Sequence, residues 1–226
     1  MNKKSDIVST YFTSIYLTII ALLQGVAIVH LVPYLINYFI SDQNRITDTY
    51  TASLFLTLLI IFVVWHHYVN GILFLRWFPN ILDALIPFAI SISEFFLIAF
   101  LEYKNQTSSM NMLAWMRTFT VFLFFGSIAY FAAALRHDET LFDNIMSKIA
   151  ASIHKKNIRW FYIRAGISMV LQGLFATFIL ILHRNWLLWF SLSFFLAHIV
   201  ISEYLHIRYI KPAFEKGISE FQTQNS

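Results

Sequence analysis

The sequence predicts an all-α membrane protein, a bundle of six transmembrane helices. Hydrophobic residues make up 58% of the 226-residue chain and charged residues only 12%, about half the share of roughly 25% that is typical of soluble domains. A single soluble core of this size cannot bury so much apolar surface. The apolar residues also occur in continuous runs, whereas the strands of a transmembrane barrel alternate with period two. Composition and pattern together favour helices in lipid.

Six apolar windows reach the roughly 20 residues that a transmembrane helix needs. Polar segments separate them, such as Ser41–Arg45 after the first window and His183–Asn185 before the last. The first window is too long for the apolar part of a signal peptide, and no small-residue cleavage site follows it, so we expect it to be retained. The predicted spans are residues 11–40, 51–75, 81–102, 112–135, 160–182 and 186–207, within a single domain 1–226.

The distribution of lysine and arginine predicts the orientation of these spans. If the N-terminus is cytoplasmic, all but four of the 16 lysines and arginines lie on the cytoplasmic side. This bias follows the positive-inside rule. The four exceptions are Arg45, Lys104, Arg117 and Arg184. An even number of spans then places both termini, the loop 136–159 and the tail 208–226 in the cytoplasm.

The loop between the fourth and fifth spans carries a helix signal of its own. Thr140 and Asp143 fit a capping box, and apolar residues then recur at helical spacing until Lys155 and Lys156. We predict an amphipathic helix over residues 140–156, lying on the inner membrane surface with its lysines toward anionic lipid headgroups. The alternative is a cytoplasmic helix packed on its own bundle.

Ionisable residues within the spans are candidates for function, because a charge in hydrocarbon costs about 2.5–3.5 kcal/mol. Asp83 and Glu94 are eleven positions apart, which is about 20° around a helix and roughly 16 Å along it. Pro87 lies on the same face and frees the carbonyl of Asp83 for another partner. This stripe predicts a path for cations or protons. The alternative places Asp83 at the inner interface and pairs Glu94 with one neighbouring helix.

Other polar residues of the first two spans are further candidates for such a path. His66 and His67 are adjacent, so they point about 100° apart on a helix and cannot serve one small site. We expect one of them to face the bundle, and we expect no metal, because neither has a partner of ligand type four residues away. The amide of Gln24 lies in lipid and requires a partner, which is often on another helix.

The last two spans hold a second group of polar residues. His198 and Ser202 are spaced i, i+4, and Glu203 and His206 are spaced i, i+3, so each pair can touch. Gln172 of the fifth span is a further candidate member. Glu203 with a protonated His206 could form a proton-responsive pair near the cytoplasmic end. The alternative is that the whole group is an ordinary interfacial polar cluster.

Three segments carry a resemblance to a known family: Ala21–Ile28 in span 1, Trp65–His67 in span 2 and Pro87–Phe88 in span 3. Their order resembles that in the prokaryotic six-span potassium channels that lack a TVGYG filter. In that family a Phe-Ser-Asp-Gly motif of span 1 lines the pore of a tetramer. Here Leu22–Gln24 replace Phe, Ser and Asp, and only Gly25 remains. The resemblance implies a homo-oligomer in a bacterial cytoplasmic membrane.

The sequence leaves several classes of function open. The first is a cation or proton channel. The second is a non-transporting sensor, effector or subunit of a multi-protein membrane system, with partners at the loop 136–159 or the tail 208–226. A small-solute transporter is less favoured, because the chain has only six glycines and four prolines to interrupt its helices.

A membrane enzyme is disfavoured, because the sequence shows no set of nucleophile and base. The chain has no cysteine, which excludes disulfides, thiolate metal sites and a cysteine nucleophile. We expect no cofactor and no nucleic-acid partner.

Overall fold

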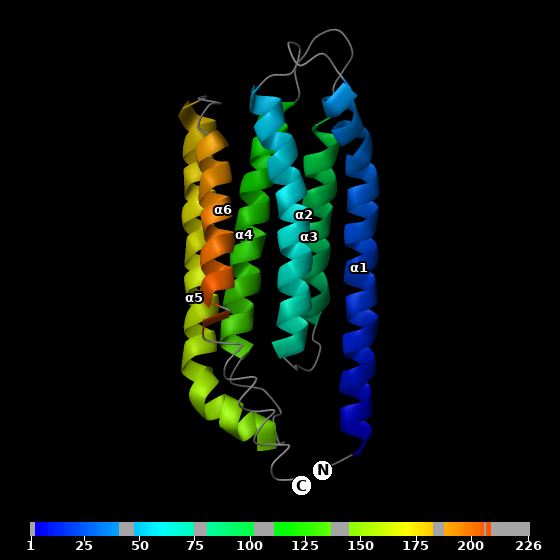
Figure 1. Ribbon diagram of the computed structural model, residues 1–226, viewed down its shortest axis with the longest axis vertical. Coiled ribbons are helices and arrows are strands. Elements are labelled where there is room, and N and C mark those ends of the chain that lie inside the picture. Colours follow the sequence, from blue (N-terminus) through cyan, green and yellow to red (C-terminus); the bar gives the residue numbers. More distant parts are fainter. Residues whose placement is uncertain are drawn as a thin grey trace.

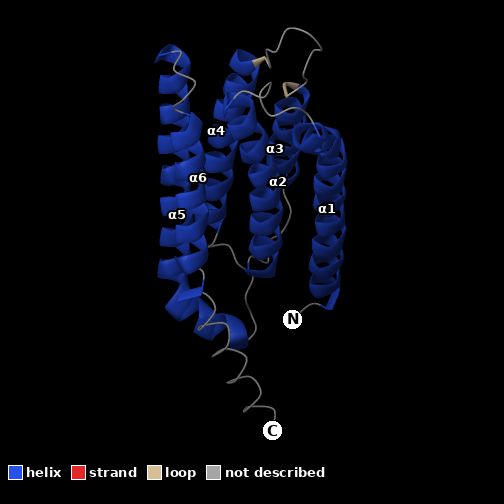
Figure 2. Ribbon diagram, turned by 45° about the horizontal axis from the view of Figure 1, so that its top comes forward, coloured by secondary structure: helices blue, strands red, loops and turns tan. Residues whose placement is uncertain are grey.

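The computed structural model describes residues 3–40, 48–74, 81–101, 111–136, 145–182, 188–205 and 207–208. The regular structure in these ranges is helical, which confirms the predicted all-α class (Figures 1 and 2). The helices are α1 (Lys3–Ile40), α2 (Asp48–Phe74), α3 (Ile81–Ala99), α4 (Met112–Arg136), α5 (Ile145–Leu182) and α6 (Leu188–Leu205).

Five of these helices, all except α3, are long and apolar enough to cross a membrane. The chain is therefore a multi-pass integral membrane protein. The apolar part of α3 is shorter, Leu85–Ala99. The whole helix has 19 residues, a rise of about 28 Å, which is close to the roughly 30 Å of a hydrocarbon core. It lies alongside the other helices in Figure 1, and its role as a sixth span stays a prediction.

Helix α5 differs from the prediction of an interfacial helix followed by a separate span. It runs without interruption over 38 residues from Ile145 to Leu182. Its sequence contains no proline, and its first glycine is Gly166, so no residue in the first five turns breaks the helix. Figure 1 shows these first turns inclined to the rest of α5. Residues 140–144 lie outside the described part, and the contact with headgroups stays a prediction.

The helices form a closed ring in the order α1, α2, α6, α5, α4, α3, in which each helix contacts the next. Helices α2 and α3 also contact each other. Helix α1 lies at one edge of the bundle, and its first residue lies at the same end of the bundle as the last residue of α6 (Figure 1). This order decides which polar residues can meet, because α1 faces α3 while α2 and α5 face α6.

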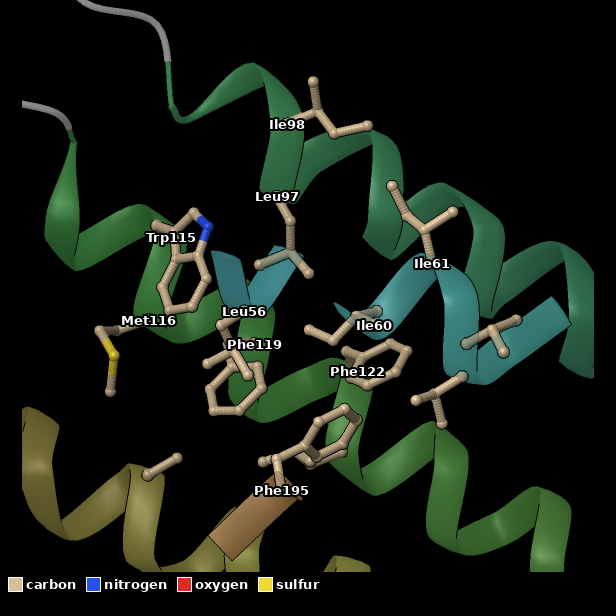
Figure 3. Packing of buried hydrophobic residues seen from close by; sticks show 14 of the residues in the cluster. Leu56, Ile60, Ile61, Leu97, Ile98, Trp115, Met116, Phe119, Phe122 and Phe195 are labelled. Atoms are coloured by element: carbon tan, nitrogen blue, oxygen red, sulfur yellow. The ribbon is translucent and has the colours of Figure 1, made fainter. Parts of the chain in front are cut away.

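Large apolar side chains fill the interior between α2, α3, α4 and α6. Figure 3 shows Leu97, Phe119 and Phe195 among them. Trp115 is fully buried, and its indole N–H donates a hydrogen bond to the Thr57 hydroxyl at 3.2 Å. Many other large apolar side chains lie exposed on the outside of the bundle, as a lipid-facing surface requires.

Glycines allow α4 and α5 to pack closely. A Cβ atom added to Gly166 would lie 3.0 Å from ring atoms of Phe131, and one added to Gly173 would lie 3.3 Å from the ring of Phe124. These phenylalanine rings therefore occupy space that a larger residue would need. Close packing of this kind is typical of membrane helices, where small residues let backbones approach.

Candidate functional site

A buried polar contact that involves an acid joins α1 to α3. The Gln24 amide nitrogen donates a hydrogen bond to Glu94 Oε2 at 2.8 Å. Glu94 is 0% exposed and Gln24 only 2%, so the contact is shielded from both lipid and water. Two of the residues that the sequence named for an ion path thus meet directly, and Gln24 is a partner of Glu94 from a neighbouring helix.

Further polar atoms lie close to this contact without a partner. Oε1 of Glu94, Oε1 of Gln24 and Oγ of Ser91 are buried and accept or donate no hydrogen bond within the described residues. Ser91 precedes Glu94 by three positions, so it lies on the same face of α3. An unpaired buried polar atom costs about 1–3 kcal/mol. The bundle therefore keeps this part of its interior polar at a cost in stability, as functional sites commonly do.

The inner face of α3 carries these groups. Pro87 is buried within the helix, one turn before Ser91. Of the predicted stripe from Asp83 to Glu94, the part from Pro87 onward thus lies on the inside of the bundle. Asp83 lies in the first turn of α3, and its side chain is outside the described part of the chain. Its place in a path stays a prediction.

A second polar contact joins α2 to α6. Nε2 of His66 contacts Oε1 of Glu203, and the pair is ionic when the imidazole is protonated. The side chains are 41% and 35% exposed, so this contact lies at the surface of the bundle. From the sequence we considered His206 as the partner of Glu203. His206 lies outside the described residues, and the observed partner is on another helix.

A third contact joins α5 to α6. Nδ1 of His198 lies 3.0 Å from the Ser168 hydroxyl, and the Gln172 amide donates to the same hydroxyl at 3.3 Å. Ser202, the neighbour we considered for His198, is buried on the same helix. Ser168 was not among the residues predicted from the sequence. Its i, i+4 spacing to Gln172 was the only available signal, since the His198 contact links distant parts of the chain.

His67 packs against interior rings, and its ring centroid also lies 5.8 Å from that of His66. Its ring centroid lies 5.5 Å from that of Tyr130 and 6.4 Å from that of His198. Tyr130 also packs against Tyr162, with ring centroids 6.3 Å apart. The two adjacent histidines therefore have different surroundings, which the 100° step between neighbouring helical residues produces.

A cavity of about 110 Å³ opens beside these rings. His67, Tyr130 and Tyr162 contribute to its wall, which is otherwise mostly apolar and comes from α2, α3, α4 and α5. Ile90 also lines it, and Glu94 lies one helical turn further along α3. Neither Glu94 nor Gln24 is among the described residues that line the cavity.

No group of three or more His, Cys, Asp or Glu residues in the described ranges is placed to hold a metal ion. No protein-family model, curated protein or solved structure matches this chain. The function is therefore inferred from the geometry of these contacts.

Proposed function

We propose that this membrane protein conducts protons or small cations and that Glu94 is the group in the path. The observation that carries the proposal is the Glu94 carboxyl, which helices enclose completely, with one oxygen held by Gln24 and the other without a hydrogen-bond partner in the described residues. Acids inside transmembrane helices are expensive and usually mark ion or proton pathways.

The resemblance to the filter-less potassium channels supports the same pair of residues. Gln24 takes the position of Asp in the family's pore motif, next to the retained Gly25. In this chain that side chain contacts Glu94, so the pair brings an acid to the position where the motif places one. Potassium is accordingly the first cation to test, and protons are the second.

The proposal is tested by flux into liposomes that contain the purified protein. Proton entry is followed with an internal pH dye, and potassium entry with a potassium gradient. Glu94→Gln removes the charge and keeps a side chain of the same length. Glu203→Gln is the matched control, because it makes the same change in an acid on α6 that lies at the bundle surface.

We expect wild type and Glu203→Gln to conduct and Glu94→Gln to lose most of the flux. Absence of flux in wild type under every gradient and pH would exclude the proposal. A loss in Glu203→Gln with normal flux in Glu94→Gln would move the path from α3 to α6.

A second candidate function is that of a non-transporting sensor or effector subunit. It is favoured because Gln24 and Glu94 pair with each other inside one copy of the chain. In this function the pair holds α1 against α3, and partners bind the loop 136–159 or the tail 208–226. Copurification of a membrane protein that is lost on deletion of the tail, together with absent flux, would support it.

A further inference from the structure

The cavity between α2, α3, α4 and α5 has the size and shape of a site for a small molecule. Its volume is about 110 Å³. Apolar cavities of this order, about 150 Å³ in one engineered protein, hold a single aromatic ring. An empty cavity destabilises the protein around it, because the lining atoms lose packing partners. An occupant would restore these contacts.

Three small residues of α4 create this hollow. Gly126, Ala129 and Ala133 all line the cavity, and their spacing of three and four residues places them on one face of the helix. A Cβ atom added to Gly126 would come within 2.7 Å of the terminal methyl group of Met169, which also lines the cavity. Larger side chains at these positions would fill the space, so residue size on one helix face determines the cavity.

The wall of the cavity is almost entirely apolar, and four of its side chains, His67, Tyr68, Tyr130 and Tyr162, carry a hydrogen-bonding atom. The ring of Tyr130 packs against those of both His67 and Tyr162. Val63, Ile90 and Phe122 are among the apolar lining residues. The lining includes no Asp, Glu, Lys or Arg among the described residues. A mostly apolar pocket with a few convergent polar groups is the usual form of a small-molecule site.

We propose that this cavity binds one neutral, mainly apolar molecule of the size of a single ring that carries one hydrogen-bonding group. The apolar wall contacts the ring, and the group of His67, Tyr130 and Tyr162 contacts the polar substituent. A neutral ligand is favoured because the described lining holds no Asp, Glu, Lys or Arg to pair with a charged one. Water alone would leave the apolar part of the wall without packing partners. The proposal does not depend on conduction.

The test uses ¹⁹F NMR of 4-fluorophenol and of fluorobenzene added to the purified full-length protein in detergent micelles. Ala129→Leu fills the cavity, and Ala133→Leu does so from the next turn if the first variant fails to fold. Ala197→Leu is the matched control, because Ala197 lies exposed on α6. Elution volume and far-UV circular dichroism establish that each variant is folded.

We expect wild type and Ala197→Leu to give a bound 4-fluorophenol signal that the filled variant lacks, with fluorobenzene bound more weakly. Signals equal in wild type and in the folded filled variant would show partition into the micelle only, and would overturn the proposal. Equal binding of fluorobenzene and 4-fluorophenol would overturn the role of the polar groups. No bound signal from either compound would overturn the site.

Discussion

Gln24 of α1 donates a hydrogen bond to Glu94 of α3 in a contact that neither lipid nor water reaches. The two residues are 70 positions apart in the sequence. The contact gives the amide a partner and leaves half of the carboxyl unbonded in the described residues. The contact therefore links α1 to α3 and leaves one oxygen of a buried acid in the interior.

The energetic coupling of this pair can be measured with methionine, which has nearly the shape of both side chains. Gln24→Met leaves the Glu94 carboxyl without its partner and should lower the free energy of unfolding by about 1–3 kcal/mol. The double variant Gln24→Met/Glu94→Met removes both polar groups and should be close to wild type. Reversible unfolding in detergent, followed by circular dichroism, measures both. A double variant that is less stable than Gln24→Met alone would show that the two side chains do not depend on each other.

Two glycines should respond differently to the same substitution. In Gly166→Ala the new methyl group would lie 3.0 Å from the ring of Phe131, whereas nothing lies within 4 Å of a methyl group added to Gly25. Both variants gain the same helix propensity, so their difference isolates the steric effect. We expect Gly166→Ala to be less stable than Gly25→Ala by about 1–3 kcal/mol in thermal unfolding. Equal stability would mean that Phe131 moves aside freely.

The contact of His66 with Glu203 should be detectable by cross-linking. The chain has no cysteine of its own, so two introduced cysteines react without background. In His66→Cys/Glu203→Cys a short bifunctional thiol reagent should join α2 to α6, because the side chains meet. In His66→Cys/Tyr204→Cys it should join them far less, since Tyr204 is 54% exposed and points about 100° away. Equal cross-linking of both variants, measured by mass spectrometry, would argue against the contact.

The expected homo-oligomer can be tested on α1. Gly25 is exposed, and Ala21 lies one turn before it, a spacing that lets two membrane helices approach closely. We expect Gly25→Cys to form a covalent dimer on mild oxidation in native membranes. Ala176→Cys is the control, because Ala176 is fully buried within one copy. Gels without a dimer band for Gly25→Cys would contradict an assembly through this face of α1.

Much of the fold follows from local sequence. In lipid every backbone group must be bonded within its own helix, so an apolar run of sufficient length forms a helix whatever it packs against. The sequence predicted a helix over 140–156 and a separate span over 160–182, and the structure joins them in one helix from Ile145 to Leu182, because no residue between them breaks the backbone. Glu94 and Gln24 stand out in the sequence for the same local reason, as polar groups in apolar runs.

The sequence by itself thus determined that helices cross the membrane and that Gln24, Glu94, His66 and Glu203 need partners. Only the tertiary structure decided which partners they have. The ring order places α1 beside α3 and α2 beside α6. It also brings Ser168, whose one local signal was its spacing to Gln172, to His198. The reason is that hydrophobicity and helix spacing are properties of one segment, whereas a buried hydrogen bond depends on how two segments pack.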